Sequence, residues 1–278
     1  MPAPAPRRAG RAGRLAAQAG GLVAPLPISP DPMPGSILPV PWGLGVAARV
    51  MALWLLAFWS LGYIVVPGAL EAFGITRDAL SARGAAALHA ALDAGELAAT
   101  AAVLWRCLRS YRPRALGWFV ARWSPVSAWA GPLAAAVACF PLVDAVAAAA
   151  HAALPADGGP WGANLLEAAI AAGDPVTCGL YFAVVALCAP AWEEAIFRGF
   201  LLPSLARNLP APAAVAASSL AFALAHFSPA RFAPLLLLGV VFGSLYARTK
   251  SLGAAIAAHS LWNVYIFAQL VLGRGVMG

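Results

Sequence analysis

The chain has 278 residues, of which 62% are hydrophobic and only 10% are charged, and its net charge is +7. Soluble domains carry about 25% charged residues, so this composition excludes a soluble globular fold and favours one that lies in a lipid bilayer. All but one of the 18 basic residues are Arg, and they lie mostly in the N-terminal segment and in short loops between apolar segments. That distribution indicates membrane topology and anionic headgroups, not nucleic-acid binding.

Residues 1–41 differ in composition from the rest of the chain. They are rich in Pro, Ala, Gly and Arg, and no acidic residue precedes Asp31. No apolar core of 7–15 residues follows the Arg cluster, which excludes a secretory signal peptide. The segment is predicted to be disordered and to act as an organelle transit peptide; the alternative is a disordered tail without a targeting role.

Seven apolar segments follow, separated by Gly and Pro residues, and each has about the length of a membrane span. They predict an all-α fold, a polytopic transmembrane bundle of about 7–8 helices with an intramembrane polar cavity. Residues 42–175 are expected to hold the N-terminal helices and residues 176–272 the motif-bearing core. The predicted segments are 44–68, 85–107, 127–153, 176–202, 211–228, 232–249 and 252–272.

Charge in the loops gives an orientation. We call the side of the bilayer that holds the N-terminus side A and the opposite one side B. Side A is expected to be cytoplasmic, or stromal in a plastid, because basic residues collect there. The side A loops hold Arg109, Arg112, Arg114, Arg122, Arg207, Arg248 and Lys250, whereas the side B loops hold Arg77, Arg83 and Arg231 with the acids Asp157, Glu167 and Asp174.

The strongest polar cluster within the apolar segments is Glu193, Glu194 and Arg198. Glu194 and Arg198 are four residues apart, so they share a helix face in the order that favours an ion pair. Glu193 points about 100° away and is left without this partner. A free carboxylate in a dry site can act as a general base near neutral pH. The alternative is that both Glu residues sit at a helix end among headgroups.

Two further helices carry polar residues at membrane depth. His226 follows Phe222 by four residues near the end of the fifth segment, where a lone His is usually a satisfied structural group. His259 and Asn263 are four apart on one face of the last segment. Two donors that converge there can bind a developing oxyanion, or they can hold neighbouring helices together through hydrogen bonds.

The three clusters together favour chemistry over structure. Charged groups at bilayer depth cost about 2.5–3.5 kcal/mol each and usually mark function. Here they supply a general base, a partner for that base and hydrogen-bond donors for the oxyanion, which are the groups that hydrolysis of an amide by activated water needs.

The motifs resemble those of a known family. Glu-Glu-x-x-x-Arg at 193–198, Phe-x-x-x-His at 222–226 and His-x-x-x-Asn at 259–263 are similar, in this order, to the three motifs of the CAAX protease and bacteriocin-processing family, the type II CAAX prenyl endopeptidases. The resemblance covers about residues 176–272. The wording around the first motif is closest to plastid members of plants and algae, in agreement with the acid-free N-terminus.

The resemblance implies an intramembrane endopeptidase that works without a cofactor. Glu193 would activate water with help from His226, and His259 and Asn263 would form the oxyanion site. Glu194 and Arg198 would position the first-motif helix, and Phe222 would pack against the site. The implied partners are the lipid bilayer and a peptide or membrane-protein substrate, with prenylated proteins as one class, and no nucleic acid. The implied location is a plastid envelope or thylakoid membrane, otherwise another cellular membrane.

The sequence leaves three alternatives open. Zinc is one, with Glu193, Glu194, His226 and His259 as ligands, although the His-Glu-x-x-His pair typical of zinc proteases is absent. A second is a catalytically silent membrane scaffold or regulatory protein of the same fold. A third is a transporter, because His89, Asp93 and Glu96 follow at i, i+4 and i+7 and share one helix face; the plainer interpretation is that this face points into the bundle. Asp144, alone in the third segment, is expected to be structural.

The sequence predicts different depths for the first two motifs. At 1.5 Å per residue, Glu193 lies about 25 Å along the fourth segment from side B, whereas His226 lies about 22 Å along the fifth from side A. Straight antiparallel helices would then hold the two side chains at different depths.

Overall fold

The computed structural model of the chain describes residues 37–76, 79–113, 117–154 and 173–273, and all of them belong to one compact unit. The first 36 residues of the expected transit peptide lie outside the described part. Four of the loop residues used for orientation do so too, namely Arg77, Arg114, Asp157 and Glu167.

The described residues form helices and connections, with no β-strand among them, as the all-α prediction requires. The first half contains α2 (Leu44–Ser60), η1 (Leu61–Val65), α3 (Val66–Ala72), α4 (Ala82–Leu108), η3 (Arg109–Tyr111), η4 (Val126–Ala128), α5 (Ala130–Val137) and α6 (Phe140–Ala153). The second half contains α8 (Pro175–Ala183), η5 (Val184–Cys188), α9 (Ala189–Glu194), η6 (Ala195–Leu201), α10 (Leu202–Ala206), α11 (Ala211–Ala225), α12 (Pro229–Thr249) and α13 (Leu252–Val271).

Within the described ranges, six helical stretches are long and apolar enough to cross a membrane, and four of them are made of consecutive helices that join. The stretch from α8 to α10 runs without interruption for 32 residues, Pro175–Ala206. The helix α11 is apolar but has only 15 residues, about 22 Å, which is less than the hydrocarbon thickness of about 30 Å. The polytopic bundle expected from the sequence is confirmed for six of the seven predicted spans, and the seventh, 211–228, forms the shorter helix α11.

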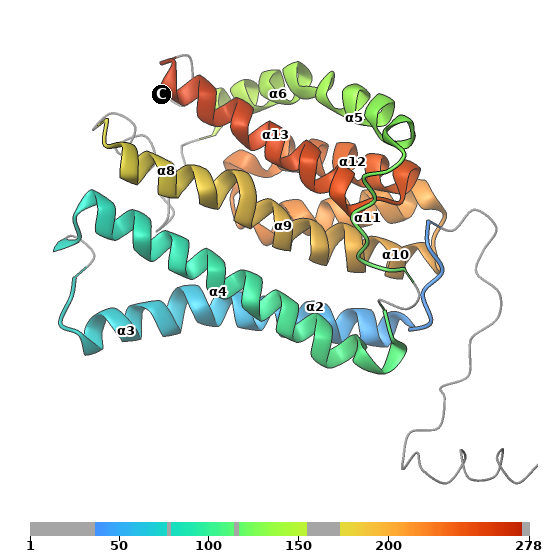
Figure 1. Cartoon of the computed structure of the whole chain (residues 1–278), viewed down its shortest axis with the longest axis horizontal. Helices are drawn as coiled ribbons and strands as arrows, with labels where there is room; N and C mark the ends of the chain where they lie inside the picture. The colour runs from blue at the N-terminus through green and yellow to red at the C-terminus, as the bar shows by residue number, and fades with distance from the viewer. Residues whose placement is uncertain (1–36, 77–78, 114–116, 155–172, 274–278) are drawn as a thin grey trace, which may run out of the picture. The chain divides into compact units, whose positions relative to one another are not determined.

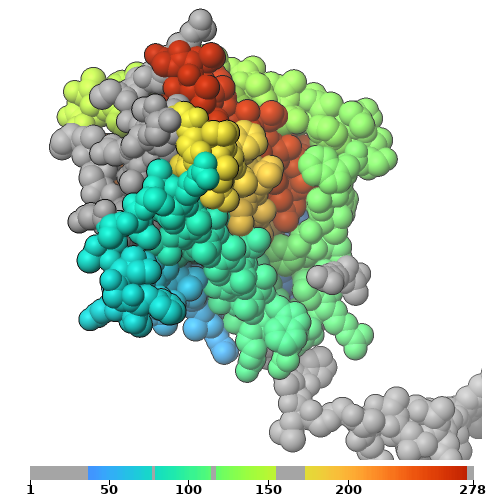
Figure 2. Space-filling model, turned by 60° about the vertical axis from the view of Figure 1, so that its left-hand side comes forward, coloured from blue at the N-terminus to red at the C-terminus, as the bar shows by residue number. Residues whose placement is uncertain are grey.

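The α8–α10 stretch lies between two groups of helices (Figure 1). The antiparallel pair of α2–α3 and α4 packs along one flank, and α13 packs along the other, with α12, α5 and α6 beyond it. In the space-filling view, α4, α8 and α13 lie side by side across one face (Figure 2). The motif-bearing stretch therefore touches both halves of the chain.

Residues 37–42 are packed into the side A end of the bundle. Ile37 and Trp42 are 2% and 1% exposed. The indole of Trp42 donates to Ser204 Oγ at 2.7 Å, and its carbonyl accepts a hydrogen bond from Arg207 Nη1. The end of the segment expected to be disordered is thus packed on the bundle, with Ile37 and Val40 buried in the core.

A strap of residues 117–123 crosses the side A ends of the motif helices. Phe119 lies against Gly199, where an added Cβ would come within 2.7 Å of the Phe119 ring. Arg122 N donates to Ser251 Oγ at 3.0 Å, and Leu252 N donates to the Val120 carbonyl at 3.1 Å. The strap therefore links the first motif helix to the start of α13.

On side B, the starts of α4 and α8 are tied by a bidentate ion pair. Arg83 Nε and Nη2 donate to the two carboxylate oxygens of Asp174 at 2.9 and 2.7 Å. Asp174 also caps α8 by accepting from the backbone and the hydroxyl of Thr177. The Arg83 guanidinium, and then the Thr177 hydroxyl, hold the pKa of Asp174 well below its usual range.

The contact between α11 and α12 depends on two glycines that are four residues apart, Gly239 and Gly243. A Cβ at Gly239 would lie 2.7 Å from Cβ and 2.9 Å from Cα of Ser219. A Cβ at Gly243 would lie 3.1 Å from a methyl group of Val215. Small residues at this spacing let membrane helices approach closely.

Candidate active site

The first motif lies on a short α-helical turn between two π-helical segments. Glu193 and Glu194 end α9, which has only six residues, and Arg198 lies in η6. The segment η5 precedes α9 directly. Such π segments are rare and concentrate at functional sites, so this helix departs from regular geometry where the carboxylates are.

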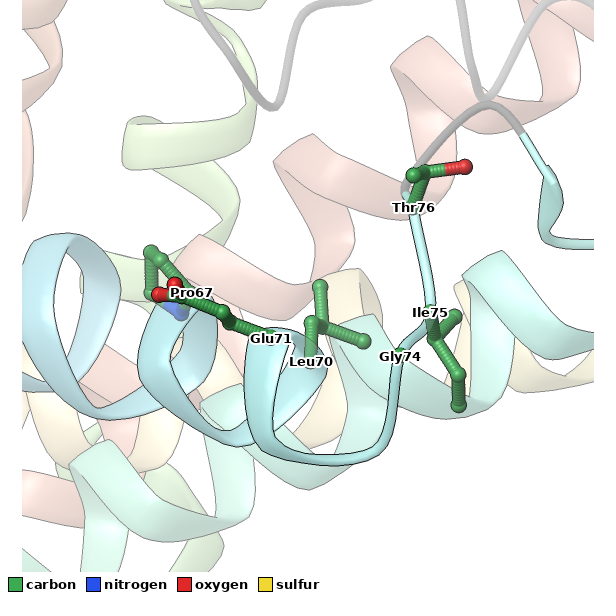
Figure 3. Close-up of a pocket in the computed structure, with 6 residues that line it drawn as sticks. All are labelled: Pro67, Leu70, Glu71, Gly74, Ile75 and Thr76. Carbon is green, nitrogen blue, oxygen red and sulfur yellow. The ribbon is translucent and has the colours of Figure 1, made fainter.

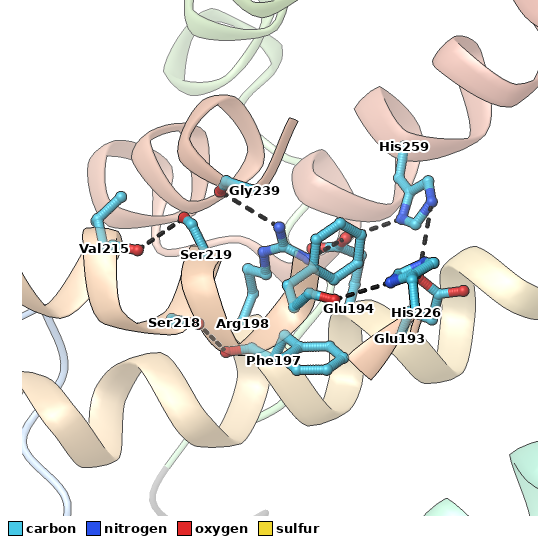
Figure 4. A network of polar contacts seen from close by, with 11 residues as sticks. Glu193, Glu194, Phe197, Arg198, Val215, Ser218, Ser219, His226, Gly239 and His259 are labelled. Carbon is cyan, nitrogen blue, oxygen red and sulfur yellow. Dashed lines mark hydrogen bonds and ion pairs between the residues drawn. The ribbon is translucent and has the colours of Figure 1, made fainter. Parts of the chain in front are cut away.

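Glu194 and Arg198 form the ion pair that their spacing predicts. Arg198 Nη1 donates to Glu194 Oε1 at 2.8 Å, and the two side chains are 1% and 0% exposed. His259 Nδ1 lies 2.9 Å from the same oxygen (Figure 4). A carboxylate can only accept, so the ring donates through Nδ1 when Glu194 is ionised. The Glu194 carboxylate therefore joins the first and third motifs.

Arg198 is held from several sides. Its Nη2 donates to the Gly239 carbonyl at 3.3 Å. Its guanidinium carbon lies 4.4 Å from the Phe222 ring centroid and 5.5 Å from that of Phe242. These contacts draw α11 and α12 to the motif helix, and both rings offer a cation–π contact to the buried charge.

Glu193 faces both motif histidines. Its Oε2 lies 3.8 Å from Nε2 of His226 and 4.0 Å from Nε2 of His259. These separations are too long for direct hydrogen bonds. The oxygen is buried and has no hydrogen-bond partner among the described residues. A buried carboxylate oxygen without a partner is costly, which makes it the first place to look for a bound water or substrate.

His226 is the C-cap residue of α11 and ends the helix at the site. Its Nδ1 lies 2.8 Å from the Phe222 carbonyl. Since a carbonyl only accepts, Nδ1 carries the proton and Nε2 of the neutral ring offers a lone pair toward Glu193. The chain then reverses at Phe227, whose φ of 50° is left-handed. Phe222 packs against His226, with ring centroids 4.7 Å apart.

The expected conflict of depths disappears when both residues are measured from side A. The fourth span continues to Ala206, 13 residues beyond Glu193, or about 20 Å. His226 lies 15 residues beyond Ala211, or about 22 Å. The fourth span ends four residues later than the predicted segment 176–202, and this places Glu193 deeper from side A than the sequence suggested.

Asn263 binds a backbone carbonyl of the motif stretch. Its Nδ2 donates to the carbonyl of Val185 at 2.6 Å. Val185 belongs to the π segment η5, where the backbone hydrogen-bond pattern is displaced by one residue. The contact ties α13 to the motif stretch 8 residues before Glu193.

Several residues at the site were not predicted as site residues. Phe242 stacks on His259, with ring centroids 4.9 Å apart. Gly239 supplies a carbonyl to Arg198, and the spacing of Gly239 and Gly243 is a signal that could have indicated this close approach. Trp192 Nε1 donates to Asp93 Oδ1 at 3.1 Å, and no local pattern links residues 99 positions apart.

The polar face of α4 points into the bundle. Asp93 and Glu96 are 5% and 9% exposed, and His89 is half-buried with its ring 5.6 Å from that of Tyr181. Asp144 accepts from Tyr265 Oη at 3.1 Å. Both observations agree with the structural interpretation of these residues.

A metal centre and a pocket are two further kinds of site that the structure could contain. Within the described ranges, no group of three or more His, Cys, Asp or Glu side chains is arranged to hold a metal ion. A pocket of about 390 Å³ lies at the end of α3 (Figure 3). It is lined by Pro67, Leu70, Glu71, Gly74, Ile75 and Thr76, none of which belongs to a motif.

Comparison with known proteins bears on the second half of the chain. Residues 175–265 match the family model described as type II CAAX prenyl endopeptidase Rce1-like. No curated protein and no solved structure matched the chain. The matched residues run from the start of α8 into α13 and contain all three motifs. With its apolar helices of membrane-spanning length, the chain is an integral membrane protein whose residues 175–265 match the model of the Rce1-like, type II CAAX prenyl endopeptidase family, a family of proteases.

Proposed function

We propose that the protein is an intramembrane endopeptidase in which Glu193 activates a water molecule to hydrolyse a peptide bond. One observation carries the proposal: the buried Oε2 of Glu193 has no hydrogen-bond partner among the described residues and faces the Nε2 atoms of His226 and His259 at 3.8 and 4.0 Å. A point about 2.8 Å from Oε2 and from either nitrogen is within hydrogen-bond distance of both. A water at that point would meet a base and an orienting group together.

The reaction then follows from the roles of the side chains. Glu193 takes a proton from the water, whose oxygen bonds to the carbonyl carbon of the substrate, and the carbonyl electrons move to oxygen. His226 orients the water through its Nε2 lone pair. The C–N bond breaks as Glu193 returns the proton to the leaving amine, so no cofactor is consumed. General-base catalysis of this kind contributes about 10²–10⁴-fold.

His259 and Asn263 are proposed to stabilise the oxyanion. The Glu194 carboxylate, itself paired with Arg198, accepts from Nδ1 of the His259 ring. Both ring nitrogens are donors only when the ring is protonated, and in that form Nε2–H would be left to bind the oxyanion. The Asn263 amide nitrogen has two N–H groups. One can hold the Val185 carbonyl while the other binds the developing charge. Removing one oxyanion donor typically costs about 10²–10³-fold.

The substrate class and the location rest on the resemblance. We propose a membrane-associated peptide or protein substrate, with C-terminally prenylated proteins as one class. The Arg-rich, acid-free N-terminus supports import into a plastid. Fusion of residues 1–45 to a fluorescent protein, imaged in plant or algal cells, should give a plastid signal, and a diffuse cytosolic signal would exclude this location.

Cleavage of a quenched peptide by the purified protein in detergent tests the chemistry. Glu193→Gln keeps size and polarity but cannot take the proton, so the rate should fall about 10²–10⁴-fold with the protein still folded. The matched control is Glu71→Gln, the same change at an exposed carboxylate of α3, which should leave the rate unchanged.

Three other outcomes of these experiments would each lead to a different conclusion. Full activity of Glu193→Gln would overturn the glutamate mechanism. Loss of activity with a chelator and its return with zinc would identify a metalloenzyme. No cleavage by the wild type over many peptides, prenylated ones included, would favour a scaffold or regulatory protein of the same fold.

A further inference from the structure

The direction of Glu193 depends on how α9 is rotated. This six-residue helix lies between the π segments η5 and η6. An N–H group that changes its acceptor from the carbonyl five residues back to the one four residues back shifts the helix by one residue, which is about 100° of rotation. The backbone ladder alone therefore leaves α9 more than one rotational setting, and side-chain contacts must select one.

On each side of Glu193, a residue of α9 makes polar side-chain contacts to other described helices. Glu194 is bound by Arg198 and His259, as described above. Trp192 donates its indole N–H to Oδ1 of Asp93 at 3.1 Å. Because Glu193 lies between the two anchored residues, releasing either contact would change where its carboxylate points.

Asp93 is unusual in its setting. It lies in α4, outside the matched residues 175–265, and is 5% exposed. Its second oxygen, Oδ2, is buried and makes no hydrogen bond of standard geometry in the described part of the chain, although the Cys188 thiol of η5 lies close enough to interact with the carboxylate. A carboxylate at membrane depth is costly and usually marks function. A neutral acceptor on the same helix can also hold an indole, because Trp54 Nε1 donates to Thr100 Oγ1 at 3.1 Å. Holding the Trp192 indole therefore does not by itself require a carboxylate.

We propose that Asp93 is a positioning residue for the hydrolysis, which sets the rotation of α9 through Trp192 and so aims Glu193 at His226 and His259. The proposal rests on the proposed function. Asp93 touches Trp192 and not the reacting atoms, so its effect is indirect. A misplacement of about 1 Å caused by a distant change can lower a rate about 10²-fold.

Kinetics of the full-length protein in detergent tests the role. Asp93→Ala should lower kcat about 10–100-fold and leave KM unchanged, whereas Asp93→Asn, which keeps an acceptor oxygen, should recover most of the loss. Thr100→Ala is the matched control, because it removes an indole hydrogen bond from the same helix, and kcat should stay at the wild-type value.

Trp192→Phe offers a second route if Asp93→Ala does not fold. It removes the donor and keeps an aromatic ring against Trp54 and Phe58. The double variant of Trp192→Phe and Asp93→Ala should be no slower than Asp93→Ala alone, because both changes remove one contact.

Hydrogen exchange of residues 184–201 gives a readout that does not need activity. Asp93→Ala should speed exchange in this segment, and Thr100→Ala should not. If the wild type never cleaves a peptide but exchange responds in this way, the proposed function fails while the anchoring of α9 stands. Wild-type kcat and exchange in Trp192→Phe, or an Asp93→Asn variant as slow as Asp93→Ala, would overturn the proposal.

Discussion

Replacement of Arg198 by Met would strand the Glu194 carboxylate, which is fully buried. Met keeps apolar bulk between Phe222 and Phe242 but supplies no charge and no donor. Glu194 would retain one contact, the His259 ring nitrogen at 2.9 Å. The Gly239 carbonyl would lose the donor that reaches it at 3.3 Å.

The structure gives the expected magnitude. Removing one partner of a buried ion pair costs about 3–5 kcal/mol. The cation–π contact with Phe222 at 4.4 Å is worth about 0.5–2 kcal/mol, but it belongs to the same buried charge and does not add in full. We therefore expect Arg198→Met to lower the free energy of unfolding by about 3–5 kcal/mol.

The double variant Arg198→Met with Glu194→Gln separates stability from function. Removing both charges of a buried pair is often close to neutral, so stability should recover. Activity should not, because His259 loses the carboxylate that orients its ring. The measurements are unfolding by SDS titration and cleavage of the quenched peptide. An Arg198→Met variant as stable as the wild type, or a double variant less stable than the single one, would refute the argument.

Two further predictions concern the side A and side B ends of the bundle. Removal of residues 1–36 should leave folding and detergent stability unchanged, whereas removal of residues 1–42 should cost about 3–5 kcal/mol because the buried Trp42 is lost; thermal unfolding of the two truncations checks this. Asp174→Asn should lower thermal stability at neutral pH because the pKa of Asp174 is held below its ordinary value of about 3.9 by Arg83. That contribution is complete above the ordinary value and fades as the pH falls from there toward the lowered pKa. The stability difference between wild type and variant should therefore stay constant from pH 7 to about pH 5 and shrink only below about pH 4, and a difference that does not shrink in acid would contradict the ion pair as its source.

Span positions could be predicted from the sequence because the bilayer demands long apolar runs. The segment 127–153 nevertheless forms two helices, α5 and α6. The break falls just before Pro141, which takes an early position in α6 and cannot continue a preceding helix. The pairing of Glu194 with Arg198 was also predictable, since four-residue spacing fixes it within one helix.

Contacts between distant residues could not be predicted. The π segment η5 contains the Val185 carbonyl that Asn263 holds, and that donor lies 78 residues later in the chain. The α4 face with Asp93 was visible as a pattern, but its partner Trp192 was not. A helical wheel drawn through residues 175–206 as one α-helix misplaces faces beyond each π segment.

Because of the two π segments, the number of residues in this stretch decides which way the side chains after each segment face. Deleting one residue from Val184–Cys188 would let an α-helical ladder continue, and 31 of the 32 residues of the stretch would remain, enough to cross the bilayer. Glu193 and everything after it would nevertheless turn by about 100° and move by about 1.5 Å relative to α8. A single-codon deletion there should spare insertion into the membrane and yet separate Glu193 from both histidines, so a change in the length of this stretch is expected to cost activity even where a substitution does not.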